Sequence, residues 1–308
     1  MALSFNPAAP SGAVAFAEPL GTLVVTGPDR LTWLNGLVTC NLAPLRPGQG
    51  AYGLATSKVG RILADVLVVV GEDRLLVSCP RARLAPLAAS LENYLVMEDA
   101  ELADDGERHA WYSLHGPAAA DAARAARAEQ ADWWVSALDR TGLGGAAMVV
   151  PRAASAEVEG RLRAVGVEIG ADGDWEELRL LRGLPAFGVD FDEKTYPQEA
   201  SLERRAVSFQ KGCYLGQEVV CRLEMRGHVH RKLVSIVLAG AAAPPVGAEL
   251  RADTGEAVGA VTSARASERL GRAVALGMVK FAFSDAGTRL SVGGAEGQVV
   301  AMPVGPRA

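Results

Sequence analysis

Apolar residues in the part of the chain before Arg231 recur with both strand and helix periods, which predicts small units that mix the two. A strand is expected over residues 13–25 and a helix over 30–37, capped by Asp29. Further strands are expected over residues 50–55, 61–70, 74–79, 98–103, 111–115 and 146–150, and further helices over 80–95, 118–128, 154–165 and 175–183. This part of the chain is therefore predicted to form two α+β units.

The pattern changes after Arg231, where short apolar runs are separated by glycine and proline. Strands are expected over residues 232–238, 249–252, 257–262, 274–279 and 289–292. Short strands in close succession without helices are typical of a β-barrel. The predicted fold class is thus α+β, with two α+β domains followed by a C-terminal β-barrel.

Composition and charge exclude some classes of partner. The 308 residues are 49% hydrophobic and 22% charged, which suits an ordinary globular core. The formal net charge of −5 argues against direct binding of nucleic acid or of an anionic membrane, because both need a basic face. No charged leader precedes an apolar stretch, and the most apolar run, residues 62–70, is too short to span a bilayer. A cytoplasmic protein is expected.

The cysteines and histidines do not form a metal-binding pattern. Cys40, Cys79, Cys213 and Cys221 are too far apart for a C-x-x-C motif, and reduced thiols are expected. His228 and His230 would share one face of a strand, but the sequence supplies no third ligand. No metal site is predicted.

The segment KGCYLGQE, residues 211–218, has the features of a functional thiol site. Gly212 and Gly216 allow turns on either side of Cys213, and a helix is expected to begin near Gly216. Helix amides and the charge of Lys211 would both favour the thiolate, so Cys213 is predicted to act together with Lys211 and Glu218. The alternative is a small residue buried beneath the turn.

This segment continues into VVCR and RGHV, residues 219–222 and 226–229, and resembles the signature of the YgfZ family, with Cys221 where alanine is usual. WLNGLVT, residues 33–39, and SKVGRILAD, residues 57–65, resemble two further motifs of that family. The resemblance covers nearly the whole chain. It implies a folate-binding protein that assists the assembly, repair or maintenance of iron–sulfur enzymes, including ones that modify tRNA.

The YgfZ family is similar to the aminomethyltransferase of the glycine cleavage system, the T-protein. This similarity implies two ferredoxin-like α+β domains and a β-barrel around a central channel that holds tetrahydrofolate. Residues 1–48 and 109–230 are expected to form a discontinuous domain, 49–108 an inserted domain and 231–308 the barrel. A chain that folds around its own channel is expected to be a monomer.

Folate recognition needs a carboxylate for the pterin and cations for the glutamate tail. The candidates for the pterin are Glu199 and Asp65, and each could equally form a surface ion pair. The other predicted folate contacts are Lys58, Arg61 and Arg222 for the tail, with Tyr214 and Gln217 from the Cys213 segment.

Two departures from the T-protein bear on activity. The resemblance places a pterin-binding glutamate where this chain has Leu181. It also implies a catalytic aspartate near Ala85, where residues 80–91 contain no acid. The expected aminomethyl-transfer acid is therefore missing from that segment.

Three hypotheses follow. The first is a folate-binding factor that serves iron–sulfur enzymes or their assembly factors through Cys213. The second is a folate-dependent aminomethyltransferase or demethylase in which Glu218 or Asp65 replaces the missing aspartate. The third is an interaction module without folate, with a basic patch formed by Arg222, Arg226, His228 and Arg231.

Overall fold

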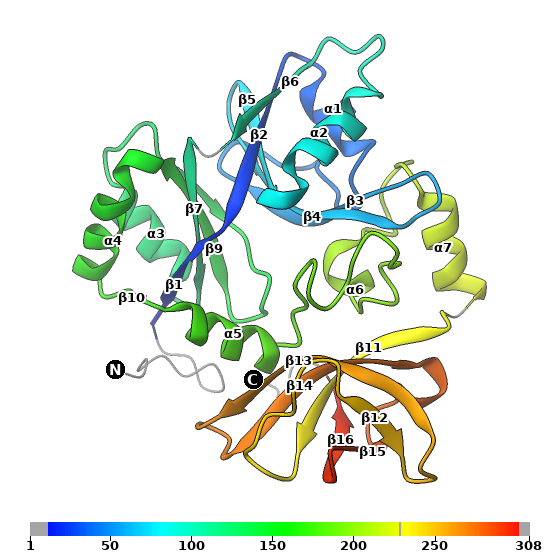
Figure 1. Cartoon of the computed structure of the whole chain (residues 1–308). Coiled ribbons are helices and arrows are strands. Elements are labelled where there is room, and N and C mark those ends of the chain that lie inside the picture. Colours follow the sequence, from blue (N-terminus) through cyan, green and yellow to red (C-terminus); the bar gives the residue numbers. More distant parts are fainter. Residues whose placement is uncertain (1–11, 107, 228, 302–308) are drawn as a thin grey trace. The chain divides into compact units, whose positions relative to one another are not determined.

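The computed structural model describes residues 12–106, 108–227 and 229–301 (Figure 1). They belong to two compact units. Unit 1 contains the chain up to Ala171 together with Arg204–Gln217, and unit 2 contains Asp172–Glu203 and the chain from Glu218 onward. The central channel expected between the domains remains a prediction.

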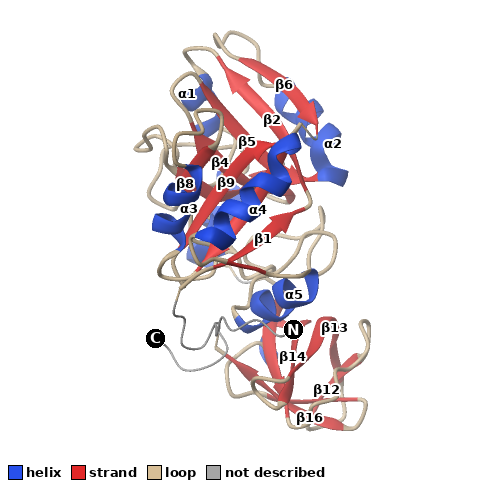
Figure 2. Ribbon diagram, turned by 90° about the vertical axis from the view of Figure 1, so that its left-hand side faces the viewer, coloured by secondary structure: helices blue, strands red, loops and turns tan. Residues whose placement is uncertain are grey.

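The first sheet of unit 1 has the strand order β10-β1-β7-β9-β8. Its strands are β1 (Val14–Glu18), β7 (His109–His115), β8 (Trp134–Ala137), β9 (Gly145–Pro151) and β10 (Glu168–Ile169). Helices α3 (Ala119–Arg127) and α4 (Ser155–Ala164) pack on it, and Figure 2 shows α4 lying across its strands. Buried alanines of α3 alternate with the exposed Asp121 and Arg124, so the small side chains face the sheet and these charges face water.

The second sheet of unit 1 has the order β3-β4-β5-β2-β6. Its strands are β2 (Leu20–Thr26), β3 (Gly50–Thr56), β4 (Ile62–Val70), β5 (Arg74–Pro80) and β6 (Glu101–Gly106), and α1 (Arg30–Asn35) and α2 (Leu84–Glu92) pack against it. Side chains of both helices and of the central strands form one buried apolar cluster.

The strand expected over residues 13–25 is in fact two strands in two different sheets. The chain passes from the first sheet to the second at Pro19, which has no N–H to donate to a ladder. Strand β2 therefore belongs to the second sheet, together with β3, β4 and β5, and helix α1 packs against that sheet. Neither belongs with the N-terminal strand β1.

Unit 2 contains a closed barrel with the order β11-β14-β13-β12-β15-β16. Its strands are β11 (Arg231–Leu238), β12 (Glu249–Ala252), β13 (Ala257–Ser267), β14 (Arg272–Lys280), β15 (Arg289–Val292) and β16 (Ala295–Val300). The sequence did not predict β16, which closes the barrel by pairing with β11. Helix α5 (Asp172–Leu181) packs on β13 and β14, while α6 (Glu203–Ala206) and α7 (Gln217–Arg226) begin at the unit boundaries.

A buried charge network fixes α5 to the barrel within unit 2. Arg179 Nη1 donates to Asp190 Oδ2 at 2.8 Å, and Arg179 Nη2 donates to Ser263 Oγ at 2.9 Å. The hydroxyls of Thr262 and Ser263 both donate to Asp190 Oδ1 at 2.6 Å. Since both carboxylate oxygens have donors, Asp190 is a structural anchor rather than a free ligand.

Candidate functional site

The three motifs singled out in the sequence meet in unit 1. The backbone N–H of Leu215 donates to Gly36 O at 3.0 Å, which joins the Cys213 segment to the end of α1. Thr56 Oγ1 donates to Leu215 O at 2.5 Å, which joins the same residue to the start of the 57–65 motif. Residues that lie more than 150 positions apart in the sequence thus form one site.

Gly216 allows this close approach. Its φ of +81° lies in the left-handed region, and a Cβ atom there would lie 2.4 Å from Ser57 O and 3.0 Å from the Cα of Gly60. Any other residue would force the two segments apart. The predicted turn at Gly216 and the helix that follows it, α7, are confirmed.

Lys211 holds the segment to the loop after α1. Its ammonium donates to the carbonyls of Asn35, Val38 and Cys40 at 2.6, 2.8 and 2.6 Å. Burial lowers the Lys211 pKa to about 8. The three donated hydrogen bonds give Lys211 a structural role, in place of the expected activation of Cys213.

Cys213 itself is exposed, whereas Cys40 and Cys79 are buried and Cys221 is half-buried. The alternative of a thiol packed beneath the turn is therefore wrong. The neighbouring Tyr214 is buried, and its ring centroid lies 5.4 Å from Lys211 Nζ. We call residues 211–216 the Cys213 turn: a rigid turn that presents one thiol to solvent.

Asp65, on β4 in the second motif, is a carboxyl group in an unusual environment. The Tyr52 hydroxyl donates to its Oδ2 at 3.3 Å, while its Oδ1 is buried and has no hydrogen-bond partner within the described ranges. Burial raises the pKa of Asp65 to about 6, and the positive charge of Arg140 opposes that shift. A carboxyl that titrates near neutrality with one oxygen still able to accept a bond is suited to acid–base work.

Two charged residues that act on the Asp65 carboxyl, Glu18 and Arg140, come from β1 and from the loop after β8. Arg140 forms an ion pair with Glu18, and both side chains are almost fully buried. Ser113 Oγ also donates to Glu18, at 2.5 Å. The sequence predicted none of these residues, nor Tyr52. Tyr52 could have been found from the pairing of two adjacent strands, but Glu18 and Arg140 are 122 positions apart and share no motif.

Two predicted folate contacts lie in the turn that leads into β4. Lys58 is exposed, and its Nζ lies 5.8 Å from the centroid of the Tyr94 ring. Arg61 closes the turn through its backbone, since its N–H donates to Ser57 Oγ at 3.2 Å and its carbonyl accepts the N–H of Ser57 at 2.8 Å. Gln217 Nε2 lies 3.4 Å from Gly212 O, within the Cys213 segment.

The remaining predicted site residues belong to unit 2. Glu199 accepts the Tyr196 N–H at 2.9 Å and the Arg231 Nε–H at 3.1 Å, so each of its carboxylate oxygens already has a donor. Glu218 and Arg222 are exposed on α7 and lie 4.0 Å apart.

The predicted basic patch includes two residues whose side chains the structure does not describe. His228 lies outside the described residues, and so does the side chain of Arg226. Within the described residues, no group of three or more His, Cys, Asp or Glu side chains could hold a metal ion. Nor does any helix in the described ranges have the length and apolarity to cross a membrane.

Leu181 is buried in an apolar cluster of unit 2 with Leu180, Leu233, Val274 and Leu276. A carboxylate at this position would have no polar partner in that cluster. The position where the resemblance implied a pterin-binding glutamate is thus part of the apolar core of unit 2.

Comparison with known proteins agrees with this architecture. The family "GCVT N-terminal domain" matches residues 12–156, and "Glycine cleavage T-protein C-terminal barrel domain" matches residues 231–307. The mitochondrial aminomethyltransferase of Gallus gallus is 30% identical over 307 residues, which cover 87% of this chain and 74% of that protein. The aminomethyltransferase of Thermosynechococcus vestitus is 29% identical over 289 residues, covering 89% and 78%.

The crystal structure of the glycine cleavage system aminomethyltransferase T from Bartonella henselae has the same fold. It superposes with a TM-score of 0.81 at 22% identity and covers 95% of this chain and 86% of that one. The predicted fold class, mixed α+β with a closed C-terminal barrel, is confirmed.

Proposed function

The chain belongs to the family of the glycine cleavage T-protein, and we propose that it binds a reduced folate in unit 1 and transfers a one-carbon group with Asp65 as the acid–base residue. The observation that carries this proposal is the buried, unpartnered Oδ1 of Asp65. The relatives are named aminomethyltransferases, which supports one-carbon transfer over the maintenance of iron–sulfur enzymes that the Cys213 segment suggested.

The residues present fit a reduced folate. A pterin carries several N–H groups, and a buried carboxylate oxygen without a donor is the complementary acceptor. The Tyr52 hydroxyl donates a hydrogen bond to Asp65 Oδ2. This bond orients the carboxylate and leaves Oδ1 to accept from a ligand. Lys58 is exposed on the turn before β4 and offers a cation for the glutamate tail.

The protein's own contribution is to position a proton. A bound reduced folate supplies the nitrogen that accepts the one-carbon group. Asp65, with a pKa of about 6, holds a proton at Oδ1 below that pH and accepts one above it. Arg140 limits the rise in that pKa, and the charge of Arg140 is balanced by Glu18. Together these charges keep the pKa of Asp65 close to neutral pH.

Calorimetric titration of the full chain with tetrahydrofolate under anaerobic conditions tests the binding step. We expect saturable one-to-one binding that Asp65→Asn weakens by about tenfold, the cost of one charged hydrogen bond. Asp73→Asn is the matched control, since Asp73 is exposed in the same unit and pairs with Arg74. Binding absent from the parent protein, or unaffected by Asp65→Asn, would remove folate from this site.

A second candidate function rests on the Cys213 turn. An exposed thiol on a backbone fixed by Lys211 and Gly216 is accessible for reaction with a partner or a cluster, whereas a packing cysteine would be buried. This arrangement supports a role in maintaining iron–sulfur enzymes, including tRNA-modifying ones, through contacts with those enzymes or their assembly factors.

Cells that lack this protein and are complemented with variants test the second function. We expect Cys213→Ser to lower the activity of an iron–sulfur hydro-lyase after oxidative stress, because serine cannot act as the thiolate. Cys221→Ser is the control, since Cys221 is half-buried on α7. Equal activity with Cys213→Ser and with the parent protein would contradict the thiol's role and leave the folate proposal intact.

A further inference from the structure

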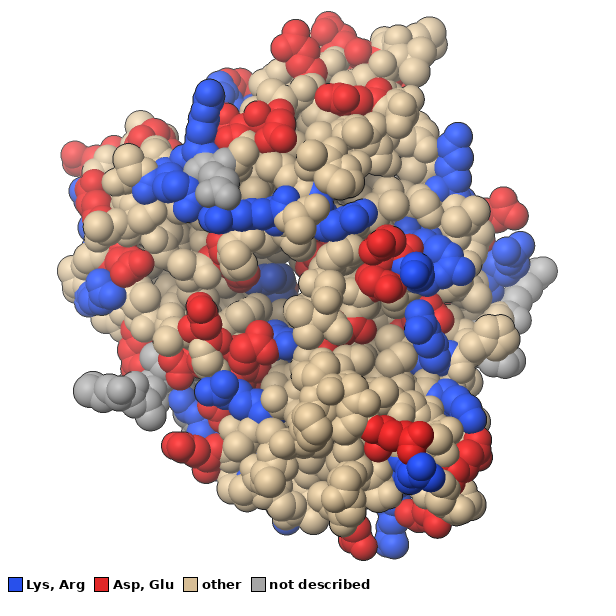
Figure 3. Space-filling model, in the orientation of Figure 1, with Lys and Arg blue, Asp and Glu red and all other residues tan. Residues whose placement is uncertain are grey.

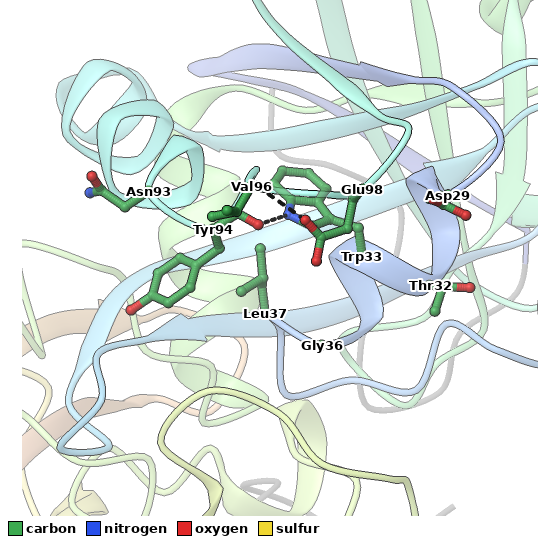
Figure 4. Close-up of a pocket in the computed structure, with 9 residues that line it drawn as sticks. All are labelled: Asp29, Thr32, Trp33, Gly36, Leu37, Asn93, Tyr94, Val96 and Glu98. Atoms are coloured by element: carbon green, nitrogen blue, oxygen red, sulfur yellow. Dashed lines mark hydrogen bonds between the residues drawn. The ribbon is translucent and has the colours of Figure 1, made fainter.

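A groove of about 560 Å³ opens in unit 1 beside α1 (Figure 4). It is lined by Asp29, Thr32, Trp33, Gly36, Leu37, Asn93, Tyr94, Val96 and Glu98. Trp33 and Tyr94 form its aromatic wall. Trp33 Nε1 donates to the backbone carbonyl of Tyr94 at 2.9 Å, which joins the two residues. None of Asp65, Tyr52, Arg140 and Glu18 lines the groove, and no step of the proposed folate chemistry uses it.

The turn beside the groove holds apolar side chains out in water. Val96 and Met97 are 81% and 92% exposed, the highest values among the exposed large apolar residues described. The turn is nevertheless ordered, since Glu98 Oε2 accepts the N–H groups of both residues at 3.1 Å. Asp29 Oδ2 accepts the N–H of Asp99 at 2.9 Å and ties the turn to α1. Two adjacent apolar side chains held in water beside a groove form an apolar surface that a partner can cover.

The charge around the groove is mainly negative. Asp29 and Glu98 line it, and the exposed Glu92 and Asp99 are adjacent in sequence to the lining residues Asn93 and Glu98. Figure 3 shows carboxylates gathered in the region where Figure 1 draws the loop between α2 and β6. Among cations, Lys58 lies beside the Tyr94 ring, while the Arg30 guanidinium turns to the carbonyls of Gly27 and Glu72.

We propose that this groove docks a segment of a partner protein in which apolar side chains alternate with lysine or arginine. The apolar side chains would cover Val96, Met97 and the aromatic wall, and the cations would face Asp29 and Glu98. A second copy of this chain would bring carboxylates against carboxylates, and an anionic membrane would meet the same repulsion. Charge complementarity therefore selects a basic, apolar protein segment as the occupant.

The position of the groove gives such a partner access to the Cys213 turn. Gly36 lines the groove, and its carbonyl accepts the N–H of Leu215 at 3.0 Å. Helix α1 thus carries the groove on one side and anchors the Cys213 turn at its end. The docking proposal does not depend on folate binding, so the two can fail separately.

Fluorescence anisotropy with a short labelled peptide of alternating leucine and lysine tests the proposal on the full chain. We expect saturable binding that weakens with added salt, and a loss of about tenfold in affinity for the double variant Val96→Ser, Met97→Ser, because exposed anchors carry most of the binding energy. Met225→Ser is the control, since Met225 is 73% exposed on α7 in the other unit.

Four outcomes of the binding measurements would overturn the proposal. They are no binding of the lysine peptide, equal binding of the same peptide with glutamate in place of lysine, unchanged affinity in the double variant, and tighter binding to phosphatidylglycerol vesicles than to the peptide. Sedimentation that showed a dimer in the parent protein and a monomer in the double variant would identify a second copy as the occupant and would also overturn it.

Discussion

Asp65→Asn is expected to lower one-carbon transfer by about 10²- to 10⁴-fold, the usual contribution of a positioned acid–base group. Asparagine keeps the size of the side chain and can still accept the Tyr52 hydroxyl, so the site should stay folded. Steady-state turnover with a reduced folate and an aminomethyl donor measures the effect. Asp73→Asn should retain the parent rate.

The pH dependence gives a second readout of the same residue. If Asp65 accepts a proton in the rate-limiting step, activity should rise as the pH passes through its pKa of about 6, and Asp65→Asn should remove that rise. Stability should respond in the opposite sense. Because the pKa is raised from 3.8, the contribution of Asp65 to stability is complete below pH 3.8 and is lost as the pH rises through about 6.

Asp65→Asn should accordingly be as stable as the parent protein or more stable at neutral pH, where the parent holds a buried charge. Thermal unfolding at neutral pH measures this. A variant that lost turnover together with a large loss of thermal stability would indicate a structural role for Asp65, and an active variant with an unchanged pH profile would exclude it from the reaction.

Lys211→Met is expected to destabilise unit 1 by roughly 3 kcal/mol, because it leaves three buried carbonyls without their charged donor. Methionine is similar in length to lysine and fills the same space, so the loss of hydrogen bonds dominates. Urea unfolding at pH 7 measures the change in the free energy of unfolding. Lys58→Met is the control, since Lys58 is exposed in the same unit.

The same substitution separates anchoring from chemistry. If Lys211 only holds the Cys213 turn, Lys211→Met should increase hydrogen exchange at residues 212–216 while leaving exchange in the barrel unchanged. An unfolding free energy equal to that of Lys58→Met would show that the three carbonyls are satisfied in some other way.

The sequence could predict most of the fold because the strands and helices have strong periods. The runs 61–70 and 74–79 gave β4 and β5 almost to the residue, and glycine and proline separated the barrel strands. Pro19 was the main obstacle, because one continuous apolar pattern concealed a change of sheet. Strand β16 was missed since Glu296 and Gln298 interrupt its apolar positions.

The candidate site was predicted in part. Asp65 and Lys211 were identified from motifs, and Asp65 keeps the role expected of it, but the role of Lys211 changed. Lys211 was expected near Cys213 from its place in the chain, whereas its side chain spans to the loop after α1, some 170 positions away. Such contacts depend on tertiary packing, and neither local propensity nor spacing encodes them.

The return of residues 204–217 to unit 1 affects the order in which the protein can be completed during synthesis. The sheets of unit 1 are translated by residue 169, but the segment that carries Lys211 and Gly216 leaves the ribosome only after the intervening helix and loops of unit 2. Until then the carbonyls of Asn35, Val38 and Cys40 lack the ammonium of Lys211. The turn at residues 57–60 likewise lacks its contact with Gly216. A nascent chain stalled before Arg204 should therefore expose this surface to chaperones, and contacts of such long range should slow the last step of folding.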